Sequence, residues 1–64
     1  MPAYVLRFLD RHSGKVVHSD RFPAQDESEA VRLAEVRRTL EPMELWIESR
    51  CVKRWDAIFP LAWD

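Results

Sequence analysis

Hydrophobic and polar residues alternate along four short segments of the chain, and a longer segment between them repeats with helical spacing. Residues 4–9, 15–22, 43–48 and 51–55 show the period of two that is typical of β-strands. Residues 26–40 place apolar side chains three and four positions apart, as an amphipathic helix does. The pattern predicts the element order ββαββ.

The ends of the predicted helix carry recognisable signals. Asp26 can accept hydrogen bonds from the backbone N–H groups of the first turn, and Glu29, three residues later, can reach back towards the helix start. Pro42 ends the helix, because the residue before a proline is pushed out of the α region. We therefore expect a helix over about 26–40.

The register of the first hairpin depends on its loop length. Gly14, the only glycine, is expected to take a positive φ at the end of a three-residue loop, 12–14, with a bulge. This loop pairs Phe8 with His18 and Arg11 with Lys15. A two-residue loop, 13–14, would exchange the faces. The longer loop buries more apolar surface and is preferred, since it places these residues together: Tyr4, Leu6, Phe8, Val16, His18 and Phe22.

The second hairpin is expected to turn near residues 48–50. Met43, Leu45 and Ile47 face one side of its first strand, whereas Glu44, Trp46 and Glu48 face the other. Either two-residue loop puts Val52 with the first group, and it puts Cys51, Lys53 and Trp55 on the Trp46 face. The turn contains no glycine or asparagine, so the sequence leaves its type open.

These elements predict an α+β domain over residues 1–56, followed by an apolar tail, 57–64. The expected sheet has four strands in the order 2-1-3-4, because a right-handed crossover links the second strand to a parallel third strand. The helix packs on one face of this sheet. The predicted buried layer comprises Tyr4, Leu6, Phe8, Val16, Phe22, Ala30, Leu33, Ala34, Val36, Leu40, Met43, Leu45, Ile47 and Val52.

The opposite face of the sheet is unusually apolar for a surface open to water. Two tryptophans and several aliphatic residues would lie there among charged ones, as in an interface core with a polar rim. The apolar tail either folds back over its own sheet or crosses to a partner. We expect a homodimer, since the core of so small a domain gives little stability unless a disulfide, a metal or a partner chain adds to it. The predicted interface comprises Val5, Leu9, Trp46, Trp55, Phe59 and Trp63.

Composition and charge narrow the setting of this domain. A formal net charge of −1 over 64 residues gives no overall attraction to nucleic acid or to an anionic membrane. No apolar stretch approaches the roughly 20 residues of a membrane span. A single thiol, Cys51, excludes an internal disulfide, and no export signal is evident. We expect a cytoplasmic protein that does not bind membranes.

The sequence offers little catalytic chemistry. Asp10, His12, His18 and Asp20 could form a metal or hydrolytic cluster, but they match no ligand spacing. Cys51 is expected to be a small apolar filler. We therefore expect no catalytic residues, no metal and no cofactor, and an interaction or regulatory module in place of an enzyme. A small metal-dependent hydrolase is the weakest alternative.

A second alternative is a module that binds single-stranded nucleic acid. Unpaired bases could stack on an open sheet face that carries Trp46 and Trp55 beside Arg7, Lys53 and Arg54. Acidic residues on the same face and the absence of a basic footprint weigh against this function.

Several of these features together resemble a group of short bacterial proteins of unknown function from high-GC genomes. The resemblance rests on the pattern Tyr4-x-Leu6-x-Phe8-x-Asp10, on Gly14, on the acidic helix start and on Glu44-Leu45-Trp46. It covers residues 4–56 and not the tail. It implies the ββαββ order and a bacterial, cytoplasmic setting, and it carries no activity.

Overall fold

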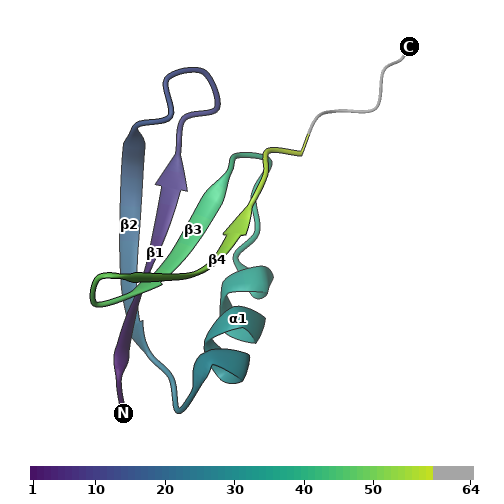
Figure 1. Cartoon of the computed structure of the whole chain (residues 1–64). Helices are drawn as coiled ribbons and strands as arrows, with labels where there is room; N and C mark the ends of the chain where they lie inside the picture. The colour runs from purple at the N-terminus through teal and green to yellow at the C-terminus, as the bar shows by residue number, and fades with distance from the viewer. Residues whose placement is uncertain (59–64) are drawn as a thin grey trace.

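The computed structural model describes residues 1–58 and confirms the predicted ββαββ order (Figure 1). Helix α1 follows the first two strands and precedes the last two. The sheet order is β2-β1-β3-β4, and all neighbouring strands run antiparallel. The elements are β1 (Ala3–Leu9), β2 (Val16–Pro23), α1 (Glu27–Val36), β3 (Met43–Ile47) and β4 (Arg50–Trp55).

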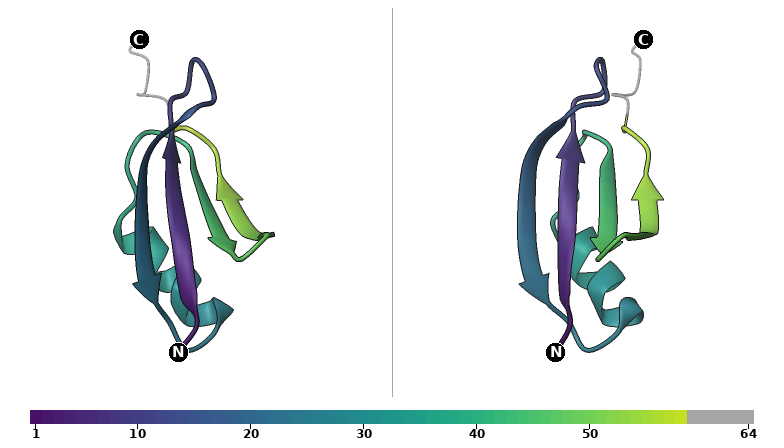
Figure 2. Two further views of the ribbon diagram at one scale, coloured as in Figure 1. Left: turned by 90° about the vertical axis from the view of Figure 1, so that its left-hand side faces the viewer. Right: turned by 60° about the vertical axis from the view of Figure 1, so that its left-hand side comes forward.

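The core lies between α1 and one face of the sheet (Figure 2). Two alanines, Ala30 and Ala34, are the buried residues of α1, and their small side chains let the helix approach the sheet closely. The rings of Tyr4 and Phe22 stack with centroids 6.3 Å apart and an interplanar angle of 25°. The buried residues are Tyr4, Leu6, Phe22, Ala24, Ala30, Ala34, Met43 and Leu45.

Part of the predicted buried layer is wrong. Val16, Val36 and Leu40 are 48%, 81% and 54% exposed. Leu40 follows the end of α1, and Val16 pairs with Leu9 on the face of the sheet opposite the helix, so neither is covered by the helix. Phe8, Leu33, Ile47 and Val52 are partly buried and pack against the core. Ala24, which the periodicity did not select, is fully buried.

Helix α1 begins as predicted and ends earlier. Asp26 is the N-cap, and its Oδ1 accepts a hydrogen bond of 2.9 Å from the Glu29 backbone N–H. The helix ends at Val36, four residues before the predicted end, with Arg37 as C-cap. The guanidinium of Arg38 then donates to the backbone carbonyls of Thr39 and Glu41. These bonds stabilise a loop from the helix to β3, so Pro42 is not what ends the helix.

The first hairpin keeps the predicted register in its body but not at its tip. Phe8 pairs with His18, as expected, and Gly14 has a φ of 76°. However, Leu9 pairs with Val16, so β2 contains one extra residue there, and the Asp10 N–H donates to the Lys15 carbonyl at 2.8 Å. The predicted pairing of Arg11 with Lys15 is therefore wrong. The loop is longer than predicted, and a β-bulge at Val17 restores the predicted register in the rest of the hairpin.

The second hairpin also contains a bulge, and this one moves a tryptophan. Ile47 pairs with Arg50 across a two-residue turn, in which Glu48 has a φ of 53°. Trp46 pairs with Cys51, but Leu45 pairs with Lys53, so Val52 is the extra residue. The bulge transfers Lys53 and Trp55 to the helix side of the sheet. The prediction that they share a face with Trp46 is wrong.

No helix in residues 1–58 is long and apolar enough to cross a membrane.

Candidate interaction surface

The face of the sheet opposite α1 is the surface on which the predicted interface residues were placed. Core residues alternate with outward-facing residues along the central strands, so Val5, Arg7 and Leu9 of β1 lie on this open face with Glu44 and Trp46 of β3. Val5 pairs with Trp46, and Arg7 pairs with Glu44. Within residues 1–58, no second layer covers this face (Figure 2).

Trp46 is held on the open face by two neighbours. The guanidinium carbon of Arg7 lies 4.7 Å from the centroid of the indole. The indole Nε1–H donates a hydrogen bond of 2.9 Å to Oε1 of Glu44. A cation over the ring and an acceptor for its only donor fix the position of the side chain. Trp46 is therefore a preorganised, half-buried aromatic group.

Glu44 connects Trp46 to the last strand. Its other carboxylate oxygen, Oε2, lies 3.0 Å from Nη2 of Arg54 in an ion pair, and the side chain of Glu44 is only 15% exposed. A continuous row of polar contacts thus crosses β1, β3 and β4, from Arg7 through Trp46 and Glu44 to Arg54. The row orders the polar groups of the open face.

The charge of the open face differs from what the sequence predicted. Arg21 pairs with Val5 and Arg54 pairs with Glu44, so both arginines join Arg7 on this face. Lys53 leaves it: its Nζ lies 3.4 Å from Oε2 of Glu35 on α1. Arg54 reaches the open face because of the bulge at Val52, whereas strict alternation along β4 would put it on the helix side.

The structure brings together half of the predicted interface. Val5, Leu9 and Trp46 lie on the open face and are each partly exposed. Trp55 lies on the helix side, where it packs against the core beneath Lys53 Nζ, 5.3 Å from the ring centroid. Phe59 and Trp63 lie outside the described residues. Cys51 does lie beside Trp46, as expected.

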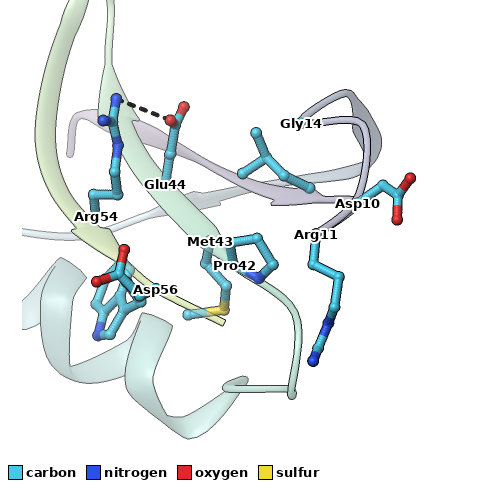
Figure 3. A pocket seen from close by; sticks show the side chains of 10 residues that line it. Asp10, Arg11, Gly14, Pro42, Met43, Glu44, Arg54 and Asp56 are labelled. Atoms are coloured by element: carbon cyan, nitrogen blue, oxygen red, sulfur yellow. Dashed lines mark ion pairs between the residues drawn. The ribbon is translucent and has the colours of Figure 1, made fainter. Parts of the chain in front are cut away.

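A hollow of about 300 Å³ lies where the β1–β2 loop approaches the end of β4 (Figure 3). The Glu44–Arg54 ion pair lies on one side of it and the Asp10–Arg11 corner on the other. The hollow is lined by Leu9, Asp10, Arg11, Gly14, Pro42, Met43, Glu44, Arg54, Trp55 and Asp56.

The loop beside this hollow is stabilised by its own polar contacts. The pKa of Asp10 is lowered, first by the Ser13 hydroxyl at 2.9 Å and then by the backbone N–H of His12. Nη2 of Arg11 donates to the Leu40 carbonyl at 2.6 Å, which joins the loop to the segment that follows α1. These contacts explain the position of Asp10 without any catalytic role.

The four residues of the possible metal or hydrolytic cluster contact one another in two pairs, Asp10 with His12 and His18 with Asp20. Nε2 of His18 lies 2.9 Å from Oδ1 of Asp20, and its ring lies 5.5 Å from that of Phe8, as a structural histidine would. His18 is 62% exposed, because it projects from the edge strand. Within residues 1–58, no three His, Cys, Asp or Glu side chains gather closely enough to bind a metal ion.

Comparison with known proteins finds no family model, no curated protein and no solved structure that matches this chain. The open face is therefore the basis for proposing a function for this protein.

Proposed function

We propose that this protein is a small interaction or regulatory module that forms a homodimer through the open face of its sheet. The observation that supports the proposal most directly is Trp46, which Arg7 and Glu44 hold in place on a face that no described element covers. Tryptophan and arginine are enriched among the residues that contribute most to binding. Val5 and Leu9 supply apolar surface on the same face.

A second copy is the partner that best meets the needs of this fold. Of residues 1–58, only eight are buried in the core, and three of them are alanines. A domain of this size buries about 60% of the surface that its unfolded chain exposes. Two sheets that stack face to face, about 10 Å apart, would add a second core. The three arginines of the face can extend their apolar stems over the contact while their charged ends remain in water.

The test is the solution mass of matched tryptophan variants, measured by light scattering on a sizing column. Trp46→Ala should dissociate the face-to-face contact and halve the mass. Trp55→Ala is the control, because Trp55 lies on the helix side. This variant should retain the parent mass under conditions in which it is folded. A chain that ends at Ile58 tests whether the tail contributes. An unchanged mass for Trp46→Ala would exclude the face as the contact.

Binding of single-stranded nucleic acid is a second candidate, which the contact of Arg7 with Trp46 favours. Aromatic rings and arginines on an open sheet can stack bases and pair with phosphates. Arg21 and Arg54 lie on the same face. If this function holds, a fluorescent oligonucleotide should bind at low salt, weaken steeply as salt rises and be released by Arg7→Ala. Absence of binding at low salt would exclude it.

A further inference from the structure

Strand β2 is an edge of the sheet, and its outer side is open. Within residues 1–58, it is bonded only to β1, and most of its residues are exposed. Val16 and Val17 are 48% and 65% exposed. An uncovered edge strand presents unpaired backbone N–H and C=O groups, which can bond to another strand. The edge thus offers a second contact surface, separate from the open face.

The direction of each backbone group on β2 follows from two hydrogen bonds of β1. The Leu9 N–H donates to the Pro42 carbonyl, and the Ala24 N–H donates to the Pro2 carbonyl. Backbone groups alternate in direction along a strand, so odd-numbered residues of β1 bond to β3 and even-numbered residues bond to β2. The partners of Phe8, Leu6 and Tyr4 on β2 therefore point inwards.

By the same alternation, the N–H and C=O groups of Ser19 and Arg21 point outwards from the sheet edge. Pro23 also takes an outward position, where its missing N–H breaks no bond to β1. The bulge at Val17 ends the free edge on one side, and Pro23 ends it on the other. What remains is a short stretch centred on Ser19.

The pairing of side chains favours one register for two such edges. If Ser19 lies opposite Ser19 of a second copy, His18 lies opposite Asp20 in both directions, where the imidazole can donate a hydrogen bond to the carboxylate. A shift that centres the pair on His18, Asp20 or Arg21 places like residues opposite one another. Within each chain, His18 and Asp20 are already ordered by their contact of 2.9 Å.

We propose that the β2 edge pairs antiparallel with the β2 edge of a second copy, about a two-fold axis at Ser19, to form one continuous eight-stranded sheet. The contact is isologous and uses both free β2 edges, so it closes after two chains. It does not depend on the face-to-face contact. A protein that uses both contacts forms a tetramer.

Cross-linking tests the register directly. Ser19→Cys, in a Cys51→Ser background, places each new thiol opposite its own copy, with Cα atoms about 5.5 Å apart, as a disulfide requires. Arg21→Cys in the same background is the matched control, because its two copies lie four residues out of step. Under mild oxidation we expect a covalent dimer at least tenfold faster for Ser19→Cys. Equal rates would overturn the proposal.

A charge swap gives a second test by solution mass. His18→Asp puts carboxylates opposite each other and should halve the mass, whereas the double variant His18→Asp with Asp20→His should restore it. If His18→Asp halves the mass and Trp46→Ala does not, the edge contact holds and the proposed face contact falls. If Trp46→Ala alone halves the mass, or if the swap fails to restore it, the edge contact is overturned.

Discussion

Trp55 lies directly opposite Met43 in the β3–β4 ladder, and both side chains belong to the helix side of the sheet. Met43 is fully buried, and Trp55 packs against the same core. Trp46, nine residues earlier in the chain, lies on the opposite face with its ring against Arg7. The two tryptophans therefore lie in different environments: Trp55 packs against the core, and Trp46 lies on the open face beside Arg7.

This division predicts different costs for the two alanine substitutions. Trp55→Ala removes a large side chain from the core, and we expect the free energy of unfolding to fall by about 2–3 kcal/mol, less than for a fully buried tryptophan. Trp46→Ala should cost about 1 kcal/mol under conditions where the protein is monomeric. Urea titrations at low protein concentration measure both values. Equal losses would contradict the placement of the rings.

The strand order, the helix and the body of the first hairpin could be predicted from the sequence, because they depend on periodicity and on one glycine. The side of the sheet that Trp55 occupies could not. The bulge at Val52 depends on how β4 packs against the helix, where Lys53 meets Glu35, and on a turn that Glu48 forms at positive φ. Neither contact leaves a pattern in a single sequence.

The same limit explains the candidate site. Val5, Leu9 and Trp46 were placed correctly on the open face, because simple alternation along β1 and β3 decides their direction. Arg54 reaches this face only because of the bulge, which alternation along β4 does not predict. The end of α1 was misplaced, since Pro42 sets an upper limit on the helix, whereas the bonds of Arg38 decide where the loop runs.

The N-cap of α1 should contribute measurably to stability. Asp26→Ala removes the acceptor for the Glu29 N–H, and we expect a loss of about 1 kcal/mol. Ser28→Ala, one residue before Glu29, is the matched control and should change the free energy of unfolding by less than half of that loss. The comparison uses urea unfolding followed by circular dichroism. A similar loss for both variants would show that the helix start does not depend on Asp26.

Asp10 should give the first loop a dependence on pH. Hydrogen bonds from Ser13 and His12 lower its pKa, so folding favours the ionised form. The stabilisation is therefore present above the pKa of an unperturbed aspartate and is lost as pH falls through the lowered pKa. We expect Asp10→Ala to melt below the parent protein at pH 7, with a gap that narrows at pH 3. A constant gap would show that ionisation of Asp10 is not involved.

Glu48 offers a position at which the protein can be stabilised. Its φ of 53° lies in the left-handed region, which side chains with a Cβ rarely adopt and which costs glycine nothing. Glu48→Gly should therefore raise the free energy of unfolding by up to about 1 kcal/mol, after allowing for the greater freedom of glycine in the unfolded chain. Ser49→Gly, at the other position of the same turn, is the control, because Glu48 is the only non-glycine residue with positive φ in residues 1–58. Ser49→Gly should lower the free energy of unfolding, because glycine has more conformational freedom in the unfolded chain. A gain for Ser49→Gly, or a loss for Glu48→Gly, would contradict the turn geometry that precedes the bulge and, with it, the separation of Trp46 from Trp55.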